Sequence, residues 1–214
     1  MEKNLQIWAQ KTKTIWIGVL LYAIGGIVYG IVAGLSSAAS TASDLMSMAG
    51  MSSGGGGVGF ITVLEYLLLA AVIVGYVMYI LGLGKFREIL DAPDATAIGK
   101  VYIGAILSAA SYVWMLFGFW GWVSSVLNIV AFVFMLLGFM ALKNSSTFPA
   151  KARKGASNLF ISMIIGLIAS VVALLLGWIP VVGGLIPGIL NLIAFIMVFV
   201  GWAQIKNADP AVLL

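Results

Sequence analysis

Long apolar runs constrain this chain more than any other feature of its sequence. Four such runs are present, at Ile15–Leu35, Phe60–Gly84, Val101–Leu142 and Leu159–Ile205. A bilayer core about 30 Å thick needs about 20 apolar residues of helix, so the first two runs correspond to one span each and the last two to two spans each. Backbone hydrogen bonding inside lipid favours helices over strands. The sequence therefore predicts an all-α integral membrane protein with six transmembrane helices, in a single transmembrane domain over residues 1–214.

The composition excludes several classes of function. Apolar residues make up 63% of the chain and charged residues 8%, and the mean hydropathy is +1.16, whereas a soluble domain carries about 25% charged residues. The chain has no cysteine and no histidine, which removes thiol nucleophiles, histidine bases and His/Cys metal sites. We therefore predict that the chain is not an enzyme, binds no cofactor or metal, and has no nucleic-acid partner.

Basic residues predict the orientation of the chain in the membrane. They lie before the first span, between the second and third, between the fourth and fifth, and after the sixth, and the three opposite loops contain none. The eleven are Lys3, Lys11, Lys13, Lys85, Arg87, Lys100, Lys143, Lys151, Arg153, Lys154 and Lys206. We expect both termini in the cytoplasm and the protein in a bacterial inner membrane.

One long segment lies between the first two spans, on the side without basic residues. Residues 36–59 are rich in serine, alanine and glycine, and we predict a flexible extracytoplasmic loop there. Small residues after a basic leader and an apolar run also occur in signal peptides. However, the 21 residues of Ile15–Leu35 exceed the usual apolar segment of about 7–15, so an uncleaved helix is favoured.

The chain also contains an internal repeat. Residues 128–144 match residues 191–207, with asparagine, glycine and lysine at the same positions, and Val72 is the first-copy counterpart of the two asparagines. The odd spans begin alike, at Ile15–Gly18, Val101–Gly104 and Leu159–Ser162. We predict three tandem helical hairpins, at approximately 1–90, 91–148 and 149–210.

Small residues recur every four positions on the odd spans and so share one face of each helix. They are Gly26, Gly30 and Gly34 in the first span, Gly104 and Ser108 in the third, and Ser162, Gly166 and Ser170 in the fifth. Such faces let membrane helices approach closely. The favoured interpretation is packing within the chain; the alternatives are a homo-oligomer seam at the three glycines of the first span, and a gating hinge.

Four polar residues form a candidate intramembrane cluster. Asn128 and Asn191 each lie about 22 Å along the helix from the lysine that ends it, and Ser111 and Ser170 lie at roughly mid-depth on the preceding spans. A buried amide needs a partner, because leaving it unpaired costs about 2–7 kcal/mol. Pairwise hydrogen bonds between helices are the simpler interpretation, and a site for a solute or a lipid headgroup is the alternative.

Acidic residues provide two further candidates. Glu65 is the ionisable residue within a span, close to the membrane interface; a water-exposed carboxylate is favoured there over a proton or cation site or an interhelical hydrogen bond. Asp91 and Asp94, with Glu88 nearby, have the side chains of a divalent-cation site. A helix start, with a carboxylate cap and Pro93 in the first turn, is the favoured interpretation.

Two functions of different classes remain. The first is a non-catalytic scaffold or accessory subunit that engages the lipid bilayer, a second copy or a partner membrane protein through its apolar helix faces. The alternative is a small transporter or channel for a neutral or small polar solute, with its pathway near Asn128 and Asn191. A membrane enzyme is a distant third, because the sequence offers no catalytic constellation.

Overall fold

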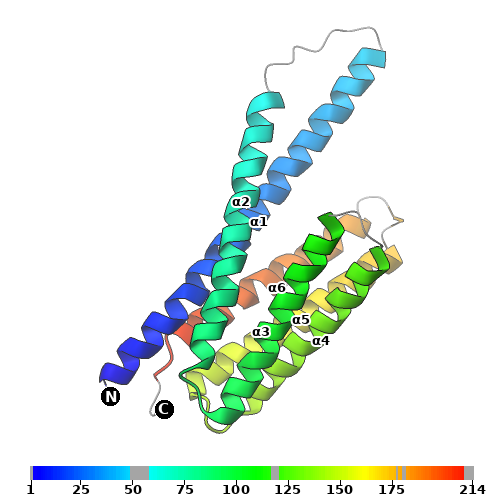
Figure 1. Ribbon diagram of the computed structural model, residues 1–214. Coiled ribbons are helices and arrows are strands. Elements are labelled where there is room, and N and C mark those ends of the chain that lie inside the picture. Colours follow the sequence, from blue (N-terminus) through cyan, green and yellow to red (C-terminus); the bar gives the residue numbers. More distant parts are fainter. Residues whose placement is uncertain (1, 49–57, 117–120, 177, 180–181, 210–214) are drawn as a thin grey trace. The chain divides into compact units, whose positions relative to one another are not determined.

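A computed structural model describes residues 2–48, 58–116, 121–176, 178–179 and 182–209. Over these residues the chain forms six helices and no strand, as Figure 1 shows. The helices are α1 (Glu2–Met48), α2 (Val58–Arg87), α3 (Ala92–Leu116), α4 (Gly121–Asn144), α5 (Ala150–Leu176) and α6 (Val182–Lys206). The predicted all-α fold of six helices is confirmed.

Five helices contain segments long and apolar enough to cross a membrane, which agrees with the prediction of a membrane protein. The segments are Leu5–Val28 in α1, Tyr66–Arg87 in α2, Trp122–Asn144 in α4, Ala150–Leu176 in α5 and Gly184–Lys206 in α6. Helix α3 is not among them. Its first turns carry Asp94 and Lys100, and the residues that follow Leu116 lie outside the described part of the chain.

Helix α1 is longer than the apolar run that it contains. It begins at Glu2 and continues to Met48, so the first part of the predicted 36–59 loop is helical. Residues 35–48 contain no glycine or proline. Half of them are alanine, leucine or methionine, which are strong helix formers, and most of the others are serine. Hydropathy alone misses this extension, because a helix outside the bilayer does not need to be apolar. Residues 49–57 lie outside the described residues.

The chain divides into two compact units, and the division falls inside α1 and α2. The first unit, called here the basal unit, comprises Met1–Trp16 and Tyr79–Leu214; the second, called here the hairpin unit, comprises Ile17–Met78. The basal unit thus contains the start of α1, the end of α2 and all of α3 to α6.

In the hairpin unit, α1 packs against α2 through a close backbone approach. A Cβ added at Gly75 would meet the backbone nitrogen of Tyr22 and lie 2.9 Å from the carbonyl oxygen of Gly18. The rings of Tyr22 and Tyr76 lie nearby with their centroids 5.2 Å apart. Because only glycine leaves room for this contact, Gly75 determines how closely the two helices approach.

In the basal unit, α3 contacts α4, α4 contacts α5, and α5 contacts α6 (Figure 1). The start of α1 joins this group through Trp8, whose indole nitrogen donates a 2.8 Å hydrogen bond to the carbonyl oxygen of Ile205 in α6. Trp8 also packs edge-on against Phe86 at the end of α2, with ring centroids 4.9 Å apart. The core of this unit is therefore built from the first and last turns of the chain as well as from its middle.

Large apolar side chains point outward along every helix. Leu174 is 82% exposed and Trp178 is 79% exposed, and many further leucine, isoleucine and valine side chains on the other helices are also exposed. A water-soluble protein of this size would expose much smaller contiguous apolar patches. An apolar solvent removes this cost, so the outward surface agrees with a bilayer environment.

Candidate functional site

The predicted polar residues of α3 and α4 are brought together. Ser111 is fully buried. Its hydroxyl donates toward two oxygen atoms, Asn128 Oδ1 at 2.7 Å and the carbonyl oxygen of Ser108 at 2.8 Å. Ser124 of α4 in turn donates a 3.2 Å hydrogen bond to the carbonyl oxygen of Ser111. The two helices are therefore joined by hydrogen bonds of two buried serines, whereas Asn128, which was expected as a buried amide, is exposed.

The other two candidate residues, on α5 and α6, are arranged differently. The Ser170 hydroxyl is exposed and donates a 3.0 Å hydrogen bond to the carbonyl oxygen of Gly166, within its own helix. Asn191 is also exposed, and its side chain forms no hydrogen bond with any residue that the structure describes. No hydrogen bond connects the two pairs in the described part of the chain, so the four residues do not form one bonded cluster there.

Glu65 lies in α2, but its side chain is outside the described residues. The surroundings of Gly30 and Gly34 are likewise outside them. The predictions made for these three residues therefore stay predictions.

The remaining small residues of the odd helices differ in how closely they are packed. A Cβ added at Gly104 would lie 2.7 Å from the carbonyl oxygen of Ala131 in α4, whereas one added at Gly26 or Gly166 would meet nothing within 4 Å. Ser162 is buried and donates a hydrogen bond to its own helix at Leu159, and Ser108 is half-buried. Of these residues, Gly104 is the one at a close helix crossing.

Close crossings also involve glycines of the even helices, which the small-residue pattern did not single out. A Cβ added at Gly138 would lie 2.7 Å from the carbonyl oxygen of Ala97, and one at Gly201 would lie 2.9 Å from that of Gly155. The signal for them was already present in the repeat, because Gly138 and Gly201 occupy matched positions in its second and third copies.

Basic side chains at one end of the basal unit rest on aromatic rings. The Lys143 ammonium lies 4.3 Å from the ring centroid of Phe160. The Lys206 ammonium lies 5.6 Å from the ring centroid of Trp16. Lys11 forms a 3.1 Å ion pair with Glu88, whose side chain is 65% exposed, so this pair contributes little to stability. These contacts link α4 to α5, α6 to α1, and α1 to the turn that follows α2.

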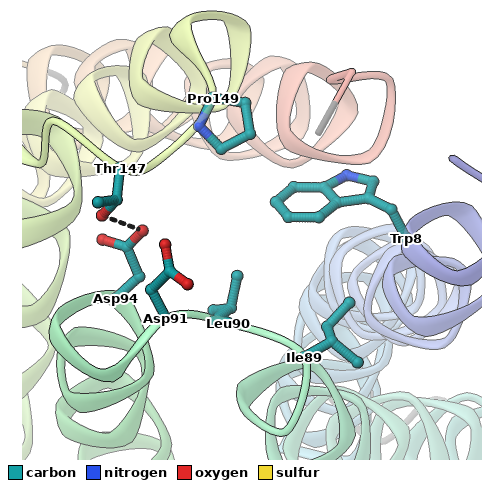
Figure 2. Close-up of a pocket in the computed structure, with 7 residues that line it drawn as sticks. All are labelled: Trp8, Ile89, Leu90, Asp91, Asp94, Thr147 and Pro149. Atoms are coloured by element: carbon teal, nitrogen blue, oxygen red, sulfur yellow. Dashed lines mark hydrogen bonds between the residues drawn. The ribbon is translucent and has the colours of Figure 1, made fainter. Parts of the chain in front are cut away.

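A small pocket opens at this end of the basal unit. It is lined by Trp8, Ile89, Leu90, Asp91, Asp94, Thr147 and Pro149. Figure 2 shows both carboxylates beside the space at its centre, with Trp8 and Pro149 on the far side. Thr147 donates a 2.9 Å hydrogen bond to Asp94 Oδ2. The sequence singled out the two aspartates, but it gave no signal for Trp8 or Thr147.

The described residues contain no group of three or more His, Cys, Asp or Glu side chains placed to hold a metal ion. No protein-family model, curated protein or solved structure matches this chain.

Proposed function

We propose that this chain is a non-catalytic membrane scaffold or accessory subunit that binds lipid and partner membrane proteins, or a second copy, through its outward helix faces. The observation that carries this proposal is the contrast between the two surfaces of its helices. The hydroxyls of Ser111 and Ser124 are buried and hydrogen-bonded between α3 and α4, while large aliphatic side chains face outward on every helix. A protein whose apolar exterior is its main feature is suited to binding other apolar surfaces.

Three tandem hairpins are the architecture that we infer for it, and repeated contacts support this inference. One glycine at the same repeat position in each copy faces the residue that begins the matched odd-helix segment. The pairs are Gly82 with Ile15, Gly138 with Val101, and Gly201 with Leu159. In each pair a Cβ added to the glycine would lie 2.5–2.8 Å from the side chain of its partner, so the same crossing recurs three times.

The centre of the basal unit favours a scaffold over a pore. Leu83, Phe139 and Trp202 each follow the repeated glycine directly and are all buried. The rings of Phe139 and Trp202 lie 6.2 Å apart, and Tyr79 packs against Trp202 at 5.6 Å. Bulky apolar side chains at matched positions of three helices leave little space for a hydrated path between them.

We propose that both termini lie on the cytoplasmic side of the membrane. It is supported by the position of the basic side chains, which gather at the end of the basal unit where α1 begins and α6 ends. Connections that carry Lys and Arg are retained in the cytoplasm during insertion.

Photo-crosslinking in native membranes tests the scaffold. A photoreactive amino acid at Leu174 or Leu192, both exposed, is expected to give a discrete protein adduct from at least one of these faces, and the same group at buried Ala169 is expected to give none. A mass tag on one copy of the chain separates self-association from binding of another protein. Lipid adducts alone, from every exposed position, would contradict the scaffold.

Flux measurements in proteoliposomes test the alternative. A scaffold is expected to give solute flux no faster than protein-free liposomes, for small neutral and polar solutes alike. Solute flux that disappears in the Asn128→Leu variant would instead identify a transporter.

A further inference from the structure

Asp94 is a buried carboxylate that is only half satisfied. It lies in the first turn of α3 and is 3% exposed. Its Oδ2 accepts the hydrogen bond from Thr147, but its Oδ1 is buried without a hydrogen-bond partner. Among the described residues it also forms no ion pair. A buried carboxylate oxygen in this state requires a compensating positive or donor group.

The space beside Asp94 brings a second carboxylate to the same position. Asp91 is half-buried and lines the same pocket, and Figure 2 shows its carboxylate directed toward the centre of the space. The pocket is about as large as a single water molecule. An organic ammonium group with its attached carbon chain is larger than this, whereas a bare inorganic ion fits.

Helix capping does not account for these two carboxylates. The carbonyl oxygen of Asp91 accepts a 2.7 Å hydrogen bond from the backbone nitrogen of Ala95, as expected at a helix start. The Asp91 carboxylate, however, forms no hydrogen bond with any described residue, so the predicted side-chain cap is absent there. A carboxylate near a helix N-terminus interacts favourably with the helix dipole even when it is exposed to water. The helix dipole therefore does not explain why Asp94 is buried.

The other copies of the repeat show that packing does not require an acid here. Asp94 lies seven residues before Val101, and the matched positions before Ile15 and Leu159 are Trp8 and Ala152. All three are buried. The position therefore accepts apolar side chains of very different size, and only the second copy carries a charge.

We propose that Asp94 and Asp91 bind a hard divalent cation, of the Mg²⁺ or Ca²⁺ class, in this pocket. Such ions prefer oxygen ligands, and Mg²⁺ in particular is held through one or two carboxylates while it keeps several waters. Two carboxylates balance the charge of one divalent ion, and the open side of the pocket admits the waters. Thr147 positions the Asp94 carboxylate by its bond to Oδ2. The bound ion joins Asp91 in the turn before α3 to Asp94 in the first turn of α3, and the Thr147 hydrogen bond connects Asp94 to the segment between α4 and α5.

Terbium luminescence tests this site in the purified full chain, because Tb³⁺ replaces Ca²⁺ at oxygen sites and is excited through a nearby tryptophan. Trp8 lines the pocket. We expect saturable emission that CaCl₂ or MgCl₂ displaces and that NaCl at equal ionic strength does not. The competition distinguishes the two divalent ions. Asp94→Asn, which keeps the acceptor for Thr147, is expected to weaken binding by roughly 10–100-fold or more.

Glu88→Gln is the matched control, because it removes an exposed carboxylate three residues before Asp91 and is expected to leave binding unchanged. The preferred ion is expected to raise the unfolding temperature of the wild-type chain. It is expected to leave the unfolding temperature of Asp94→Asn unchanged. Asp91→Asn provides a second test if Asp94→Asn does not fold. Two outcomes would overturn the proposal and leave only water beside Asp94. The first is an equal affinity for Tb³⁺ in the wild type and both aspartate variants. The second is an absence of saturable emission together with an unchanged unfolding temperature. The site does not depend on the proposed scaffold function.

Discussion

At the scale of single residues, the described spans show how few polar groups a membrane bundle needs. Ser111 and Asn128 lie on neighbouring helices and are seventeen residues apart in sequence, and their similar depth made this pairing predictable. Ser170 and Asn191 are twenty-one residues apart, and the Ser170 hydroxyl bonds its own helix instead of Asn191. Depth in the membrane predicts which residues are level, but not the rotation of each helix about its axis.

The Ser111–Asn128 hydrogen bond is expected to contribute modestly to stability. Ser111→Ala removes the donor to Asn128 and should lower the free energy of unfolding by about 0.6–1.7 kcal/mol, the range of interhelical hydrogen bonds in membranes. Ser170→Ala is the control, because this hydroxyl is exposed and bonds its own helix; it should change stability little. Unfolding in mixed micelles measures both. Equal losses in the two variants would show that the interhelical bond has no effect of its own.

At the scale of helices, hydropathy and the repeat predicted the number of elements and their order, while contacts between distant segments escaped them. The extension of α1 to Met48 follows from helix propensity, which a search for apolar runs does not use. The pocket around Asp94 combines Trp8, Asp91 and Thr147. These residues are far apart in sequence and share no motif, so only the folded chain brings them together.

Helix crossings at the repeated glycines are expected to tolerate no side chain. Gly138→Ala places a Cβ 2.7 Å from the carbonyl oxygen of Ala97, and because backbone cannot move aside cheaply, the overpacking should cost about 1–3 kcal/mol. Gly166→Ala meets nothing within 4 Å and should be neutral or slightly stabilising, since alanine favours a helix over glycine. Thermal unfolding in detergent compares the two variants. A loss of stability in Gly166→Ala as large as that in Gly138→Ala would contradict this account of the crossings.

At the scale of the whole molecule, the position of eleven basic residues is a stronger constraint than their number. A net charge of +4 alone would suit a nucleic-acid partner, but the chain places its basic residues near the starts of α1, α3 and α5 and the ends of α2, α4 and α6. Two of them, Lys143 and Lys206, rest on aromatic rings at one end of the basal unit. Which side of a membrane this end occupies follows from the charge rule and not from the fold.

The absence of cysteine makes the orientation directly measurable, because the unmodified chain gives no background with thiol reagents. Lys151→Cys and Trp178→Cys place single thiols at exposed positions near opposite ends of α5. In intact cells, a membrane-impermeant maleimide should label the thiol at 178 and reach that at 151 only after permeabilisation. Labelling of position 151 in intact cells would reverse the proposed orientation.

The hydrogen bond between Trp8 and Ile205 links residues 197 positions apart in sequence. A ribosome produces Trp8 long before Ile205. The Trp8 indole can therefore form this hydrogen bond only after the five helices that follow α1 have been synthesised. The basal unit is therefore completed last. A chain interrupted before α6 leaves an indole, and the aromatic cluster around it, open to the quality-control machinery of the membrane.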